Sequence, residues 1–170
     1  TSSAGGGSSS TTGAGGSSPC EGVDSTIEAV TKGEVGPGVK VKLTGVVATS
    51  QKFLVSKGST SGSCLWGVFG STGGLTETGP NTGMLILDYG FNAEIPEGGT
   101  DAFCPVIGKD PVGDDIPDDI APGDELDIIG ETANFLLGNC ATETDGATVG
   151  QFQLAKSCLV EKTGTQPLPK

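Results

Sequence analysis

Residues 39–44 alternate apolar and polar side chains, and this alternation constrains the fold more than any other feature of the chain. Val39, Val41 and Leu43 stand at every second position, a period that places them together on one face of a β-strand. Gly45 then interrupts the alternation and an apolar pair follows, as happens where a bulge or sharp bend lets one strand serve two sheets. The pattern predicts a bent strand of a closed β-barrel.

The same arrangement returns in residues 124–133. Leu126 and Ile128 are in phase there, and Gly130 stands at the predicted bend. Further extended segments are predicted at residues 52–56 with 64–71, at 84–89 and at 149–160. The connection over residues 91–121 has no useful periodicity, and its length leads us to expect that a disulfide or an ion pins it. The whole pattern predicts an all-β domain.

Composition divides the chain into three parts. Residues 1–19 contain only Thr, Ser, Ala, Gly and one Pro, so they bury too little apolar surface to offset the entropy of ordering. We expect a flexible Ser/Gly-rich N-terminal extension that suits O-glycosylation and that neighbouring subunits or attached sugars could order. Residues 20–163 form the predicted domain, and residues 164–170, rich in proline, form a C-terminal tail.

The charged residues argue against catalysis. The chain carries a formal net charge of -12 and contains neither Arg nor His. It therefore lacks the side chain that most often reads phosphates and base edges and the commonest neutral-pH base and metal ligand. Since its acids cluster in flexible sequence, we predict a protein that is not an enzyme. No run of about eighteen apolar residues is present, so no membrane span is predicted.

Five cysteines indicate a disulfide-bonded, secreted protein. They are far apart and form no CxxC pair, which argues against a zinc site, and disulfides persist in oxidising compartments such as the cell exterior. The candidates are Cys20, Cys64, Cys104, Cys140 and Cys158. Two bridges leave one cysteine over. Either Cys20, at the start of the domain, bonds to another subunit, or it pairs within the chain and another thiol is buried and inert.

Acidic residues are densest between residues 110 and 127. Carboxylate oxygens are calcium ligands, but the spacing of an EF-hand is absent. The alternatives are a solvated acidic loop, which we expect, and a calcium site, so no cofactor is predicted. The weak candidates for metal ligands are Asp114, Asp115, Asp118 and Asp119.

Several segments, taken in order, resemble OB-like domains found beside secreted bacterial nucleases and in bacterial surface lipoproteins. They are TIEAV, VKLTGVVATSQKFLVS, WGVFGS, GMLILDYG and APGDELDIIGETANF. The resemblance spans residues 26–162 and implies a five-stranded OB-like Greek-key barrel. OB barrels bind nucleic acids, sugars and proteins alike. Because no nuclease motif is present, nuclease activity is not implied.

Charge is distributed unevenly along the sequence. Residues 32–57 carry five lysines and one glutamate, whereas residues 91–131 carry twelve acids and one lysine. If the two regions lie on different faces, unlike charges attract in head-to-tail contacts, and such contacts build filaments when they do not close. The alternative is that the asymmetry only keeps a secreted protein soluble.

These observations predict a non-catalytic secreted structural protein, the subunit of an extracellular filament or surface coat. It would self-associate into a homo-polymer through its N-terminal extension. Residues 23–30, predicted as a short extended segment, would lie on their own barrel or complete the open sheet edge of a neighbour. The residues assigned to assembly are Cys20, Val23, Ile27 and Ala29.

The competing prediction is an extracellular OB-fold binding module for nucleic acid, as extracellular DNA, or for polysaccharide. OB platforms that bind single strands combine a positive groove with aromatic side chains on which bases stack. Lysines and aromatics occur close together in the predicted first three strands. The candidate ligand-binding residues are Lys52, Phe53, Lys57, Trp66 and Tyr89.

Overall fold

The computed structural model of the chain describes residues 20–57, 63–91, 94, 103–109, 112–136 and 150–170. Within these residues the fold is mostly β, as predicted, with one short helix, α1 (Ile27–Thr31). The strands are β1 (Val23–Asp24), β2 (Lys40–Ala48), β3 (Phe53–Lys57), β4 (Cys64–Thr72), β5 (Gly83–Gly90), β6 (Asp124–Leu136) and β7 (Gly150–Thr165).

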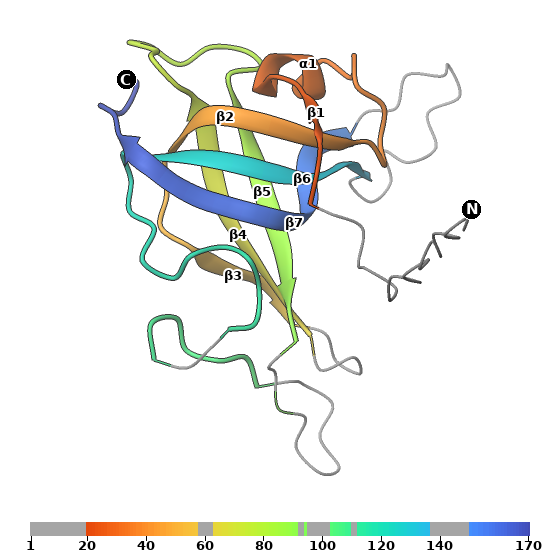
Figure 1. The fold of residues 1–170 in the computed structure, drawn as a ribbon, viewed down its shortest axis with the longest axis vertical. Coiled ribbons are helices and arrows are strands. Elements are labelled where there is room, and N and C mark those ends of the chain that lie inside the picture. The colour runs from red at the N-terminus through yellow and green to blue at the C-terminus, as the bar shows by residue number, and fades with distance from the viewer. Residues whose placement is uncertain (1–19, 58–62, 92–93, 95–102, 110–111, 137–149) are drawn as a thin grey trace, which may run out of the picture.

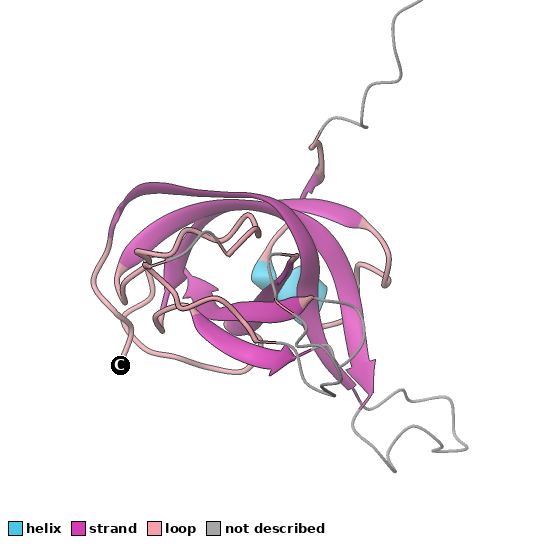
Figure 2. Cartoon of the chain, turned by 90° about the horizontal axis from the view of Figure 1, so that it is seen from below, coloured by secondary structure: helices cyan, strands magenta, loops and turns pink. Residues whose placement is uncertain are grey.

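The strands form one mixed sheet that closes on itself. Their order is β1-β2-β6-β7-β5-β4-β3, and an additional pairing of β2 with β4 joins five of the seven strands into a ring. Figure 2 looks into this ring, and the strands curve around its centre. β1 and β3 lie outside the ring, each paired with one of its strands (Figure 1).

The predicted bend at Gly45 is confirmed, and it allows β2 to pair with two partners. Lys40 to Leu43 pair antiparallel with β6 alone, whereas beyond the bend Val46 and Val47 pair antiparallel with both β6 and β4, and Ala48 pairs with β4. The register of β2 against β6 shifts between Leu43 and Val46, where Gly45 has a φ of 66°. A residue with a Cβ is strained in that left-handed conformation, so glycine is the residue type that suits this corner.

A long connection between β5 and β6 brings the chain back to the first strand of the ring. β2, β4 and β5 follow one another as antiparallel neighbours, and β6 then comes back beside β2. β7 closes the ring, antiparallel to β6 and parallel to β5. The parallel contact is short, with Leu85 opposite Gln153 and Ile86 opposite Leu154.

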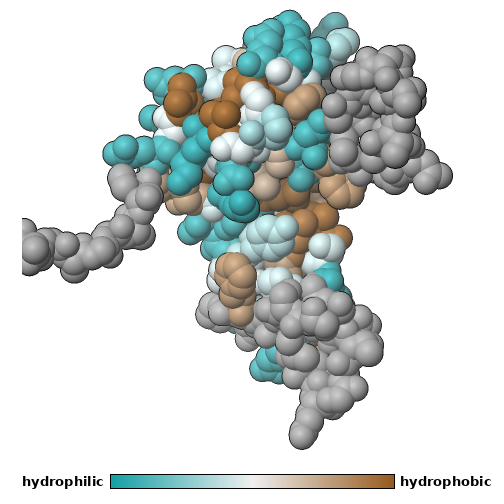
Figure 3. Space-filling view, turned by 90° about the vertical axis from the view of Figure 1, so that its right-hand side faces the viewer, coloured by the Kyte–Doolittle hydropathy of each residue, from teal (hydrophilic) through white to brown (hydrophobic). Residues whose placement is uncertain are grey.

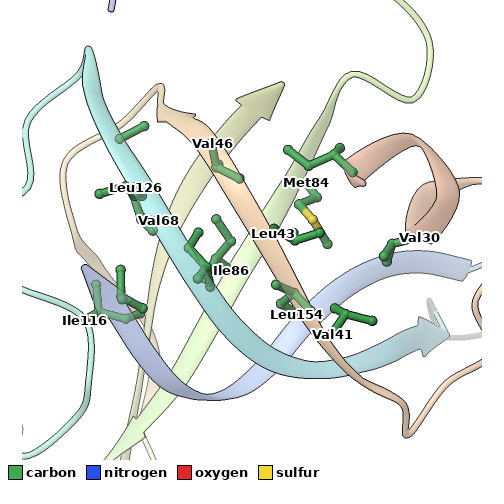
Figure 4. Close-up of a cluster of buried hydrophobic side chains, with 14 of the residues drawn as sticks. Val30, Val41, Leu43, Val46, Val68, Met84, Ile86, Ile116, Leu126 and Leu154 are labelled. Atoms are coloured by element: carbon green, nitrogen blue, oxygen red, sulfur yellow. The ribbon is translucent and has the colours of Figure 1, made fainter. Parts of the chain in front are cut away.

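The core fills the interior of the ring. Alternate residues of every ring strand point inward, and Ile116 and Ile120 of the connection before β6 pack against them. Figure 4 shows side chains from separate strands converging on one centre. The ring residues that are at most 1% exposed include Val41, Leu43, Val68, Ile86, Leu126, Ile128 and Leu154.

The prediction that residues 23–30 are extended is wrong beyond Asp24, because the segment turns into α1. Thr26 caps this helix, since its side chain accepts a hydrogen bond from the amide of Ala29 at 3.1 Å. Ile27 and Val30, three positions apart on one helix face, are buried in the core. Ile27 and Val30 therefore pack against the ring of their own chain, whereas Val23 is exposed and Ala29 is partly exposed.

Two disulfides lie within the chain. Cys20 bonds to Cys158 of β7, and Cys64 of β4 bonds to Cys104. Pairing of Cys20 within its own chain was one of the two predicted alternatives, and the bond to another subunit is not what the structure has. Cys140, the remaining cysteine, lies outside the described residues. Disulfides of this kind are typical of an oxidising compartment. No helix in the described ranges is long and apolar enough to cross a membrane.

Candidate binding face and buried charge cluster

An apolar surface covers the outside of β4 and β5. Along β4, Trp66 and Val68 turn toward the interior, so Leu65, Gly67 and Phe69 face outward by the two-residue period of a strand. Their cross-strand partners on β5 are Tyr89, Leu87 and Leu85. We call this surface, with Phe53 and Val55 of β3, the outer face.

Gly67 is at the centre of the outer face and lets its neighbours come close. A Cβ built on Gly67 would lie 2.9 Å from Val55 and 3.0 Å from Leu87, closer than side chains tolerate. Phe53 pairs with Gly67 in register, and its ring stacks on that of Phe69, with the centroids 5.3 Å apart. The absence of a side chain at Gly67 therefore makes room for Val55 and Leu87 at the centre of the outer face.

The outer face is accessible to solvent at Phe69 and Tyr89, whereas Gly67 and Leu87 at its centre are buried. Phe69, which stacks on Phe53, is 44% exposed, and Tyr89, opposite Leu65 further along β4, is 41% exposed; exposed aromatic side chains are a common mark of an interaction site. Figure 3 shows apolar side chains gathered in patches between polar ones on the side of the molecule that it presents, so an exposed apolar patch alone does not identify the site.

A hollow of about 450 Å³ adjoins Phe69, and a second one of about 420 Å³, whose lining includes Glu77 and Lys170, lies elsewhere on the surface. In the hollow beside Phe69, Phe69 and Leu85 supply the apolar wall, while hydroxyl and amide groups supply the polar part. None of its lining residues is charged. This hollow is lined by residues that include Thr49, Phe69, Ser71, Thr82, Leu85 and Gln151.

The predicted ligand-binding residues separate into two groups. Phe53 and Tyr89 belong to the outer face, and Lys57 is exposed at the end of β3. Lys52 and Trp66 are buried on the other side of the sheet. Ligand binding by these residues stays a prediction, but the five positions do not form one surface.

Lys52 is the centre of a buried charge cluster. Its ammonium donates hydrogen bonds to Asp114 Oδ1 at 2.7 Å, to Asp118 Oδ1 at 2.5 Å and to the carbonyl of Ile116 at 2.7 Å. It also lies 5.6 Å from the centroid of the Trp66 ring, within reach of a cation–π interaction. The lysine side chain is 0% exposed, Asp114 is 2% and Asp118 is 31%.

Burial shifts the titration of two carboxyl groups here. Burial raises the pKa of Asp88 to about 6, although the backbone amides of Asp115 and Tyr89 donate to its carboxylate and oppose the shift. Burial also raises the pKa of Asp114, against the opposing effect of the Lys52 ammonium. Both groups are thus biased toward the neutral acid.

The predicted metal-ligand candidates have different surroundings. Asp114 and Asp118 neutralise Lys52, while Asp115 and Asp119 are exposed, as expected of a solvated loop. Asp119 pairs with Lys162 at 3.2 Å. Within the described ranges, no group of three or more His, Cys, Asp or Glu side chains is placed to hold a metal ion.

The described residues assigned to assembly contact their own domain. Cys20 is bonded to Cys158, and Val23 pairs with Val41 of β2. Ile27 is buried beneath α1, while Ala29 is partly exposed on that helix. Assembly through residues 1–19 concerns residues outside the described ranges and stays a prediction.

Sequence reasoning missed Asp88 and the hollow. Asp88 ends the apolar run of β5, and a carboxylate in such a run was a usable sign of a buried acid. The hollow had no such sign, because its residues come from five separate segments of the chain. Comparisons with protein family models, with curated proteins and with solved structures find no match to this chain.

Proposed function

We propose that this protein is a non-catalytic extracellular binding domain, an OB-like barrel that holds an uncharged polysaccharide on its outer face. The observation that carries the proposal is the uncharged hollow beside the stacked pair of Phe53 and Phe69. The two disulfides and the absence of His and Arg from the chain support an extracellular protein without catalytic groups.

The order of the ring strands supports an OB-like barrel. In a Greek key, three successive strands are neighbours and the fourth returns to lie beside the first. β2, β4, β5 and β6 follow this order. OB-folds bind oligonucleotides and oligosaccharides on the face of their second and third strands. Those strands correspond to β4 and β5, which carry the outer face.

The chemistry of the hollow favours a neutral sugar chain over DNA. Hydroxyl and amide groups beside an aromatic ring can pair with sugar hydroxyls while the ring covers an apolar sugar face. Phosphate binding needs lysine or arginine at the surface; of the two lysines predicted to bind a ligand, Lys52 is paired with two carboxylates inside the protein and Lys57 alone is exposed. The net charge of -12 further opposes a polyanion.

Affinity electrophoresis tests the proposal. Native gels containing dextran, β-glucan or xylan should retard the protein, and Phe69→Ala and Tyr89→Ala should each restore much of its mobility. Leu159→Ala is the matched control, because this partly exposed residue of β7 pairs with Ile129 of β6 and does not line the hollow. Full mobility in every neutral polysaccharide, or binding of DNA at low salt instead, would overturn the ligand class.

A second candidate is the subunit of an extracellular filament or coat. The outer face continues onto β3, which pairs only with β4 in the described part of the sheet. A second copy of the chain could add a strand there and cover Val55 and Phe69. Light scattering separates the candidates, since a protein that stays monomeric at millimolar concentration is not such a subunit.

A further inference from the structure

The charge cluster around Lys52 has no part in the proposed binding face, and it holds a primary amine against a carboxyl group away from water. The Lys52 side chain is 0% exposed and that of Asp114 is 2% exposed, with 2.7 Å between Nζ and Oδ1. At this separation the carboxyl carbon of Asp114 is close enough for attack by the amine.

Asp114 is incompletely satisfied as a carboxylate. Its Oδ1 accepts from Lys52, but its Oδ2 is buried and has no hydrogen-bond partner among the described residues. A buried carboxylate oxygen without a partner is costly. Conversion of this group to an amide would remove one oxygen and, with it, the unpaired buried atom.

We propose that Lys52 and Asp114 react to form an intramolecular amide. This isopeptide bond would link the residue just before β3 to the connection that precedes β6. Nζ of Lys52 attacks Cγ of Asp114, a C–N bond forms, and the C–O bond to one carboxyl oxygen breaks. That oxygen leaves as water. The ammonium and carboxylate thus become an amide plus one water molecule, so atoms balance and no oxidant or reductant is needed.

Asp118 is placed to move the proton. Its Oδ1 lies 2.5 Å from Nζ, so its carboxylate can accept the ammonium proton and free the amine for attack. Its side chain is 31% exposed, which gives the proton and the released water a route to solvent. Asp114 lacks such exposure, and burial favours its neutral form, which is the better electrophile. These differences assign Asp114 as the partner and Asp118 as the proton acceptor.

The isopeptide bond would attach to the sheet the same connection that a disulfide already holds there. Lys52 and Asp114 are 62 positions apart, and Cys64 and Cys104 link β4 to the same connection. The disulfide can be reduced, whereas an amide cannot. The isopeptide bond would therefore keep the connection attached to the sheet in a reducing medium.

Mass spectrometry of the purified, reduced and denatured chain tests the proposal. The expected mass is that of the sequence less one water, and protease digestion should give one branched peptide pair joined through Lys52 and Asp114. Asp114→Ala and Lys52→Arg should restore the full mass. Asp118→Asn should slow or abolish the water loss. Lys162→Ala is the matched control, because this lysine also pairs with two carboxylates, Asp119 and Asp124, but at an exposed site; its variant should still lose water.

The unmodified mass in the wild-type protein, verified as folded by circular dichroism, overturns the proposal. It is also overturned if the water loss persists in Lys52→Arg, because cyclisation at the Asp145-Gly146 sequence would then account for it. The wild-type measurement alone decides the matter if a variant fails to fold.

Discussion

Replacement of Lys52 by methionine should be among the most destabilising single changes in this protein. Methionine retains the length of the side chain and removes its charge. The change leaves Asp114, whose side chain is 2% exposed, without the only hydrogen bond made by its carboxylate to another side chain in the described residues. Asp118 loses the same partner but is 31% exposed, so water can replace part of what it loses.

The structure sets the size of the effect. In the chain before the proposed amide forms, breaking the buried ion pair by removing one partner costs about 3–5 kcal/mol, because the remaining charge stays buried; once the amide has formed, the variant lacks that cross-link as well. Since the Lys52–Asp114 pair is buried on both sides, the whole of this range applies to it, and the contribution of the partly exposed Asp118 is smaller. For a domain of this size the loss corresponds to a fall in Tm of roughly 6–20 °C.

Urea denaturation at neutral pH, followed by tryptophan fluorescence, measures this loss. Lys162→Met is the matched control, and it should cost far less stability than Lys52→Met because its side chain is 33% exposed and its ion pairs are screened by solvent. The double variant Lys52→Met/Asp114→Leu should recover much of the stability, since it removes both buried charges. A loss below about 1 kcal/mol for Lys52→Met would refute the reasoning, because Lys52 would then be solvated or unpaired.

Three further predictions concern other parts of the fold. Burial raises the pKa of Asp88 to about 6 from 3.8, so the folded state keeps a proton that the unfolded chain has released, and stability falls as pH rises through this window. Asp88→Asn should therefore raise the free energy of unfolding by about 1 kcal/mol at about pH 7.5 and give no gain at about pH 3.5, as measured by urea denaturation at both pH values; an equal gain at both would contradict the assignment. Leu126→Ala, at a fully buried position inside the ring, should cost about 3 kcal/mol in the same assay, and a change within about 0.5 kcal/mol would mean that the residue is not in the core. Joint replacement of Cys20 and Cys158 by serine opens a bridge between positions 138 apart and should cost about 4 kcal/mol; if Tm is unchanged, the bridge does not form in the protein.

Much of the architecture could be predicted from local patterns. The alternation before Gly45 and its return before Gly130 placed two long strands, because side-chain period and glycine conformation are local properties of the backbone. The helix α1 escaped this reasoning. Its five residues are too short for a helical period to stand out, and the cap at Thr26 competes with a strand-like apolar pattern.

The partners of individual side chains were not predictable in the same way. The sequence predicted that Lys52 is an exposed lysine beside an aromatic residue. It also predicted that Asp114 is one of several acids in a solvated loop. Only the closed ring brings them together, 62 positions apart, under a connection held by a disulfide.

The sequence by itself determined the β character of the chain, the bend at Gly45 and the presence of cysteines that can form disulfides, since each follows from residue type and spacing. The tertiary structure alone decided which charges are buried, which cysteines pair and where the hollow lies beside Phe69. The physical reason is that desolvation and ion pairing depend on residues that are distant in the chain. A local pattern contains no information on those neighbours.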